Sequence, residues 1–106
     1  MARYQHLPVY QASYVLVREV YKLKVNLPKN VKYELGSELS KSSLKIIKGV
    51  VLANGSQGTY RVKILKILCL EMEVLWTYFR LLFDLKCISK GEFKIFLNAW
   101  QMLGNS

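Results

Sequence analysis

The sequence has few of the residues that carry out most enzyme chemistry. It contains one histidine, His6, and two cysteines, Cys69 and Cys87, among 106 residues. A histidine-based dyad or triad would have to use His6, and a metal site usually needs several histidine, cysteine or carboxylate ligands close together. The chain also lacks a P-loop, a GxGxxG motif and an HExxH motif. We therefore expect a protein that is not an enzyme, with no catalytic residue, no metal site and no cofactor.

Long uninterrupted apolar runs are also absent. The most apolar segment, residues 64–83, contains Lys66, Glu71, Glu73 and Arg80, and these charges argue against a membrane-spanning helix. The apolar stretch near the start is broken early by charged residues and lacks the small-residue cleavage site of a signal peptide. Two cysteines allow one disulfide at most and form no CxxC pair, which does not support a disulfide scaffold. We expect a cytoplasmic protein with no membrane contact.

Proline and glycine are sparse, and most of them lie near the ends of four longer segments. The two prolines are Pro8 and Pro28, and the clearest turn signals are residues 54–58 and 86–91. Within the segments, apolar residues recur at spacings of three and four, which predicts helices. Short connections between such helices favour antiparallel neighbours. We predict one all-α domain over residues 1–106, an antiparallel up-down-up-down four-helix bundle with helices at about 8–26, 31–54, 59–86 and 89–103.

Two glycines lie inside the second predicted helix, residues 31–54. Each costs roughly 1 kcal/mol relative to alanine in a helix interior. Small residues at such places usually allow another backbone to cross closely. We interpret Gly36, Ser42, Ser43 and Gly49 as packing positions, and the alternative is a helix broken near Gly36.

The third predicted helix, residues 59–86, is more apolar than one face of a helix requires. A first row is spaced by three and four, like the seam of a coiled coil: Val62, Leu65, Cys69, Met72, Trp76, Phe79 and Phe83. A second row flanks it: Ile64, Leu68, Leu75, Tyr78 and Leu82. Glu71 interrupts the second row, and we expect it to pair with a lysine of another helix or with Arg80 of a neighbouring copy.

The two rows allow two interpretations. They could form one broad core stripe. Alternatively, the surplus surface meets another subunit, because a monomer rarely exposes so large an apolar patch. We favour the second interpretation and predict a homo-oligomer whose interface contains Leu68, Leu75, Trp76, Tyr78 and Leu82.

Negative charge is scarce, and the positive excess is confined to one part of the chain. The sequence has 16 Lys+Arg against 7 Asp+Glu, a formal net charge of +9. Residues 1–66 hold 12 of the basic and 3 of the acidic residues, whereas residues 67–106 hold four of each. Like charges close together repel one another, so such a surface favours a polyanionic partner.

We therefore predict RNA or DNA binding by the basic residues of the first two helices and the start of the third. These residues are Arg18, Lys22, Lys29, Lys32, Lys41, Lys45, Lys48, Arg61, Lys63 and Lys66. Two alternatives stay open: the lysines serve only solubility, or they meet an acidic protein surface.

Two of the seven tyrosines are candidates to stack on unpaired bases. Tyr33 directly follows Lys32, and Tyr60 directly precedes Arg61. Both tyrosines lie near the expected ends of helices. The other tyrosines fall mostly on helix faces, where packing is the commoner role.

Several short runs resemble the four helix bundle protein superfamily over most of the chain, from about Leu7 to Gly104. Runs that its branches share are Leu27-Pro28-Lys29, Tyr33, Leu35-Gly36, Leu39, Ser43, Ile46-Ile47 and Asn54-Gly55. Later runs look more like one branch, the accessory variability determinant (Avd) of diversity-generating retroelements. These are Arg80-Leu81-Leu82-Phe83-Asp84-Leu85-Lys86, Ile88-Ser89 and Trp100-Gln101-Met102-Leu103-Gly104.

A second branch comprises proteins encoded in intervening sequences of bacterial 23S ribosomal RNA genes. That branch typically carries an Asn-Ile-Ala-Glu-Gly-like run at the end of its second helix. Here the corresponding run is Val51-Leu52-Ala53-Asn54-Gly55, which has no acidic residue. This departure favours the Avd branch.

The resemblance to the Avd branch implies an antiparallel four-helix bundle that assembles into a basic, ring-like homopentamer. It also implies that the ring binds the retroelement's reverse transcriptase and nucleic acid. The ring would then support error-prone copying of template RNA into cDNA without performing chemistry itself. The alternatives are a protein of the ribosomal intervening-sequence type, or a structural protein that binds an acidic protein partner.

Overall fold

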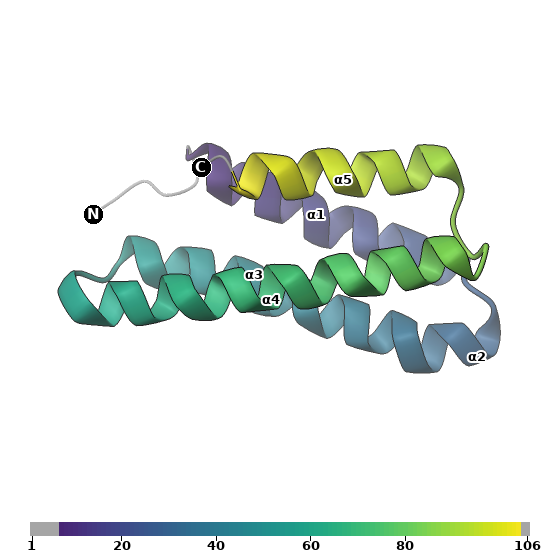
Figure 1. The fold of residues 1–106 in the computed structure, drawn as a ribbon, viewed down its shortest axis with the longest axis horizontal. Helices are drawn as coiled ribbons and strands as arrows, with labels where there is room; N and C mark the ends of the chain where they lie inside the picture. The colour runs from purple at the N-terminus through teal and green to yellow at the C-terminus, as the bar shows by residue number, and fades with distance from the viewer. Residues whose placement is uncertain (1–6, 105–106) are drawn as a thin grey trace.

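The computed structural model describes residues 7–104, which form four helices (Figure 1). The first is α1 (Pro8–Val25), and the second runs without interruption through α2 (Lys29–Val31), η2 (Lys32–Gly36) and α3 (Ser37–Asn54). The third is α4 (Gly58–Asp84), and the fourth is α5 (Lys90–Gly104). No strand occurs among these residues. The prediction of an all-α fold with four helices is confirmed, and every helix end lies within two residues of its predicted position.

Local sequence signals fix where the helices begin. Pro8 lies in the first turn of α1, where its missing N–H leaves no bond unmade, and Pro28 caps the second helix. At α5 the chain forms a capping box. The Glu92 N–H donates to Ser89 Oγ (3.1 Å), and the Ser89 N–H donates to Glu92 Oε1 (2.9 Å). The chain turns back at each connection between helices (Figure 1).

The second helix is widened at Gly36 but not broken there. Residues 32–36 form one π-helical turn between α2 and α3. Gly36 is buried, and a Cβ at this position would lie 3.1 Å from Leu27 Cδ1. At Gly49 a Cβ would lie 2.8 Å from Leu68 Cδ2 of α4. Both glycines therefore allow close packing, as the sequence indicates, and Ser42 and Ser43 are buried beside them.

All four helices contribute to the core. α3 packs against α1 and α4, and α5 packs against α1 and less extensively against α4. The completely buried apolar side chains are Leu16, Val20, Leu39, Ile46, Leu75 and Leu82. The buried hydroxyls of Ser13 and Ser43 donate to the carbonyl oxygens of Tyr10 and Ser40, each at 2.8 Å. They therefore leave no unsatisfied donor in the core.

Aromatic contacts hold α5 on the C-terminal half of α4. The ring of Phe79 stacks on that of Phe96 with centroids 4.2 Å apart, and Phe83 stacks on Phe93 at 4.9 Å. Near the end of α5, Trp100 Nε1 donates to the carbonyl oxygen of Met72 (3.1 Å). The residues of α4 before Met72 span roughly 20 Å, and Figure 1 shows α4 extending past the end of α5.

The structure places both apolar rows of α4 partly in the core. Leu75 and Leu82, from the second row, are fully buried, and Leu68 is buried as well. These three are core residues, which corrects their predicted place in a subunit interface. Trp76 and Tyr78, the other two predicted interface residues, are half-buried. The first row is instead exposed at Val62, Leu65 and Cys69, because α5 does not reach that part of α4.

Within residues 7–104, none of the helices combines the length and the apolar character that crossing a membrane would require.

Candidate nucleic-acid interface

The strongest concentration of positive charge lies around the connection between α3 and α4. From residue 39 to residue 70 the sequence contains no aspartate or glutamate. The same stretch contains Lys41, Lys45, Lys48, Arg61, Lys63 and Lys66. Since α3 and α4 are packed side by side and joined by a short connection (Figure 1), the last turns of α3 and the first turns of α4 lie at one end of the molecule. The fold therefore brings basic residues of α3 close to basic residues of α4 that lie in a different part of the sequence.

One of these cations is compensated by an acid from the other helix. Lys45 Nζ lies 3.8 Å from Glu71 Oε1, and Ser42 Oγ donates to Glu71 Oε2 (2.9 Å). The expected pairing of Glu71 with a lysine of another helix is thus confirmed. Arg80 pairs instead within α4, with its Nε 3.2 Å from Asp84 Oδ1. Lys45 consequently carries less free charge than its neighbours along α3.

The remaining cations near the connection have no such partner. Lys48, Arg61, Lys63 and Lys66 are exposed, and none of them forms an ion pair with a residue in the range 7–104. We call these four residues the cationic end. Their charges are free to contact phosphate groups, which bind such side chains without reading sequence.

The other predicted basic residues are not part of the cationic end. Lys29 and Lys32 lie on α2 and η2, at the opposite end of the molecule from the α3–α4 connection (Figure 1). Arg18 borders an apolar groove between α1 and α3. Lys41 lines a hollow that also contains Glu34 and Glu38. The ten residues therefore do not form one continuous band.

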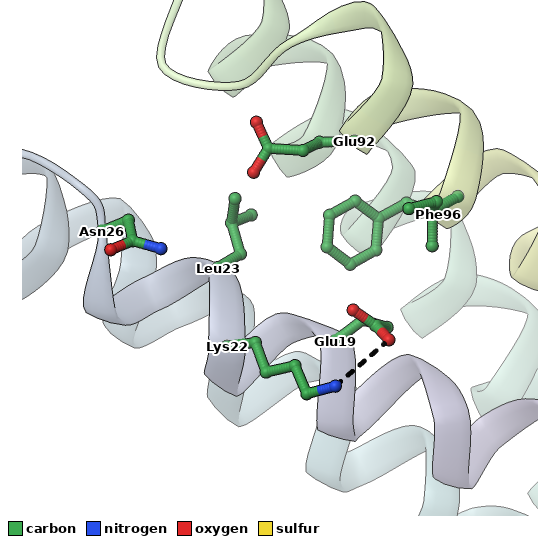
Figure 2. Close-up of a pocket in the computed structure, with 7 residues that line it drawn as sticks. Glu19, Lys22, Leu23, Asn26, Glu92 and Phe96 are labelled. Carbon is green, nitrogen blue, oxygen red and sulfur yellow. Dashed lines mark ion pairs between the residues drawn. The ribbon is translucent and has the colours of Figure 1, made fainter.

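Lys22 lies beside acidic groups, in a hollow of about 110 Å³ between α1 and α5. Figure 2 shows its ammonium group paired with Glu19, with Nζ 3.8 Å from Oε1. Glu92 of α5 lines the same hollow, next to Leu23. Two carboxylates around one lysine disfavour a phosphate at this place.

A second hollow lies directly beside the cationic end, between α3 and α4. We call it the α3–α4 groove, and its volume is about 280 Å³. It is lined by Lys45, Lys48, Gly49, Leu52, Tyr60, Ile64, Ile67, Leu68 and Glu71. Of the two tyrosines that the sequence singles out, Tyr60 lines this groove, whereas Tyr33 lies in the hollow with Glu34 and Glu38. The contrast was already visible in the sequence, since Glu34 directly follows Tyr33 whereas Tyr60 lies in the stretch without acidic residues.

α4 carries a third apolar row, which was not predicted from the sequence. Ile67 and Leu70 are 66% and 68% exposed, and Val74 and Leu81 are exposed as well. We call these four residues the outer stripe. Their spacings of three, four and seven place them on one helix face, and this pattern could have been found in the sequence. The other two rows contain more apolar residues and drew the prediction instead. The outer stripe is exposed to solvent in the isolated chain, as is the start of the first row.

Among residues 7–104, no group of three or more histidine, cysteine, aspartate or glutamate side chains could hold a metal ion. His6 lies outside the described residues. Comparison of the chain with protein-family models and with curated proteins finds no match.

Proposed function

We propose that this protein is a non-enzymatic accessory protein of a diversity-generating retroelement. It binds RNA or DNA, together with a reverse transcriptase, and supports mutagenic cDNA synthesis. The observation that carries the nucleic-acid part is the cationic end, where Lys48, Arg61, Lys63 and Lys66 project from a stretch without acidic residues. The retroelement part rests on the resemblance of the sequence runs to the Avd branch.

Direct binding measurements test the nucleic-acid part against an acidic protein partner. Labelled RNA and DNA are titrated with the protein by fluorescence anisotropy, with polyglutamate as a competitor. We expect both nucleic acids to bind and polyglutamate to compete weakly, because it lacks closely spaced phosphates. Binding to polyglutamate with no binding to either nucleic acid would favour the acidic protein partner instead.

Gene context and co-purification test the retroelement part. We expect a reverse-transcriptase gene and paired template and variable repeats beside the gene for this protein, and co-purification of the two proteins. A surrounding 23S ribosomal RNA gene would instead favour the ribosomal intervening-sequence branch.

We also propose that the up-down-up-down bundle assembles into a ring-like homo-oligomer, a pentamer by resemblance. The outer stripe supports assembly, because four large apolar side chains along one exposed helix face are costly to leave in water. A ring would also repeat the cationic end around its circumference and so multiply the contacts to one nucleic-acid strand.

Replacing Leu70 with glutamate is expected to dissociate the assembly without unfolding the chain. Leu70 is highly exposed within one chain, so a carboxylate there costs little in the monomer but would be buried in a subunit contact. Light scattering should show the mass fall to that of one chain, with an unchanged circular dichroism spectrum. Val25→Glu, at a comparably exposed apolar residue on α1 (70% against 68% for Leu70), should leave the mass unchanged. A wild-type monomer at micromolar concentration would contradict assembly.

Removing the charge of Glu71 is expected to strengthen nucleic-acid binding. Glu71→Gln releases Lys45 from its ion pair, while the amide oxygen can still accept from Ser42. One additional phosphate contact should raise the affinity about five-fold at ~0.1 M salt. Glu34→Gln changes the net charge equally at an exposed position on η2, away from the cationic end, that forms no ion pair with residues 7–104. An equal gain in both variants would mean that net charge, and not Lys45, sets the affinity.

A further inference from the structure

We propose that the α3–α4 groove holds one unpaired nucleotide of a single strand, with the base against Tyr60 and the phosphate on Lys48. This inference rests on the nucleic-acid binding proposed above and assigns it a specific subsite. It follows from three features of the groove: an apolar floor, an aromatic wall and one free cation at the rim.

The floor of the groove is apolar because α3 and α4 approach each other closely there. Gly49 has no side chain, and Leu68 of α4 occupies the space in which a Cβ of residue 49 would lie, 2.8 Å from Leu68 Cδ2. Ile64 and Leu68 are buried beneath the groove, while Leu52 and Tyr60 remain exposed at its sides. A flat apolar group in this groove can contact the apolar floor with its edge or face and stack on the ring of Tyr60.

The volume of the groove fits a small planar group. At about 280 Å³, it lies just below the range of roughly 300–1,000 Å³ that is typical of small-molecule pockets. A base in a duplex is already stacked and paired, and it would have to be unstacked before it could enter such a groove. An unpaired base presents its face freely, and aromatic side chains bind such faces whatever the base.

The charges at the rim favour an anionic group at one place. Glu71 is held by Lys45 and Ser42, so its carboxylate is partly neutralised. Lys48 has no ion-pair partner among residues 7–104 and lines the same groove as Tyr60. A nucleotide, which joins a flat base to a phosphate, matches this combination better than an apolar protein side chain. A second copy that packed its own cationic end against this groove would bring like charges toward Lys48, which is unfavourable.

The hollow around Tyr33 provides an internal comparison. Tyr33 is more exposed than Tyr60, at 68% against 55%, so exposure alone would favour it as a stacking residue. Glu34 and Glu38 line its hollow together with Lys41, and carboxylates repel a phosphate backbone. We therefore assign the stacking role to Tyr60 and none to Tyr33.

The test compares tyrosine variants on three DNA probes by fluorescence anisotropy. The probes are a single strand of about 20 nucleotides, longer than most single-strand sites, the same strand with abasic positions, and the matching duplex. We expect Tyr60→Ala to weaken binding of the intact single strand by at least about five-fold, with a much smaller effect on the duplex and on the abasic strand. Tyr60→Phe should retain binding, and Tyr33→Ala should match the wild type.

The outcomes distinguish failure of the nucleotide subsite from failure of nucleic-acid binding as a whole. Equal affinities of Tyr60→Ala and Tyr33→Ala for the single strand, or an equal loss by Tyr60→Ala on all three probes, would overturn the subsite but leave nucleic-acid binding intact. If the wild type binds none of the probes, both proposals fail. If Tyr60→Ala lowers the mass of the assembly by light scattering but not the affinity, the groove is a subunit contact and the nucleotide site is wrong.

Discussion

Replacing Phe79 with alanine is expected to destabilise the protein by about 3–5 kcal/mol. Phe79 is 2% exposed, and its ring stacks on Phe96 at a centroid distance of 4.2 Å. The substitution would remove the main aromatic contact between α4 and α5 and leave a cavity that rigid helices cannot close. Because small domains have only about 5–15 kcal/mol of stability, a loss of this size should leave the variant partly unfolded at 25 °C or only marginally folded.

Urea unfolding followed by circular dichroism measures this loss. Both proteins should be compared at one concentration, because assembly adds to the apparent stability. Tyr33→Ala is the matched control, since it also removes an aromatic ring but from an exposed position, and its change should stay within about 0.5 kcal/mol. A loss below 1 kcal/mol for Phe79→Ala would mean that α5 is not held by the contact described here.

Reversing three charges of the cationic end is expected to lower the affinity for single-stranded nucleic acid by at least about 100-fold. In a single strand the binding constant varies with salt to the power of about −0.7 per phosphate contact, so each contact contributes about five-fold at ~0.1 M salt. Changing Lys48, Arg61 and Lys63 to glutamate removes three contacts and adds repulsion. All three side chains are exposed and form no ion pair with residues 7–104, so the fold should survive.

A second triple variant with the same change in net charge tests whether the position of the charges matters. Lys29, Lys90 and Lys94 are exposed residues on α2 and α5, outside the cationic end. Changing them to glutamate alters the net charge by the same amount and should cost much less affinity. If both triple variants lose affinity equally, the binding depends on overall charge and the cationic end has no special role.

The helices could be predicted closely because several local signals agree. Pro8, Pro28 and the Ser89–Glu92 capping box mark helix starts, and the apolar spacing of three and four identifies what lies between. The π-helical turn at residues 32–36 was not predicted. Gly36 in this turn packs against Leu27, which lies in the connection between α1 and α2. Contacts of that kind leave no local pattern in a sequence.

Which row of α4 faces the core could not be predicted from spacing. Both rows follow helical spacing and are apolar except for Glu71 in the second row, so spacing does not show which of them is buried. Their burial depends on where α5 ends, which the contact between Trp100 and Met72 shows. Leu68 was therefore expected at a subunit interface but is buried, whereas Leu65 was expected in the seam but is exposed.

The charge asymmetry was readable from the sequence, but the free charges were not. Counting basic and acidic residues places the positive excess within residues 1–66. Whether a given lysine is compensated depends on pairs such as Lys45 and Glu71, which lie on different helices. The acidic neighbours of Tyr33 could be read from the sequence, because Glu34 directly follows it. The groove beside Tyr60 could not, because it forms between two helices.

The salt dependence of binding to a single strand is the most direct test of nucleic-acid recognition by the cationic end. The logarithm of the binding constant should fall linearly with the logarithm of salt concentration, with a slope of about −3 or steeper for four phosphate contacts. The triple reversal of Lys48, Arg61 and Lys63 should reduce the steepness by about two. A slope near zero for the wild type, or the same slope in the variant, would contradict phosphate binding at this surface.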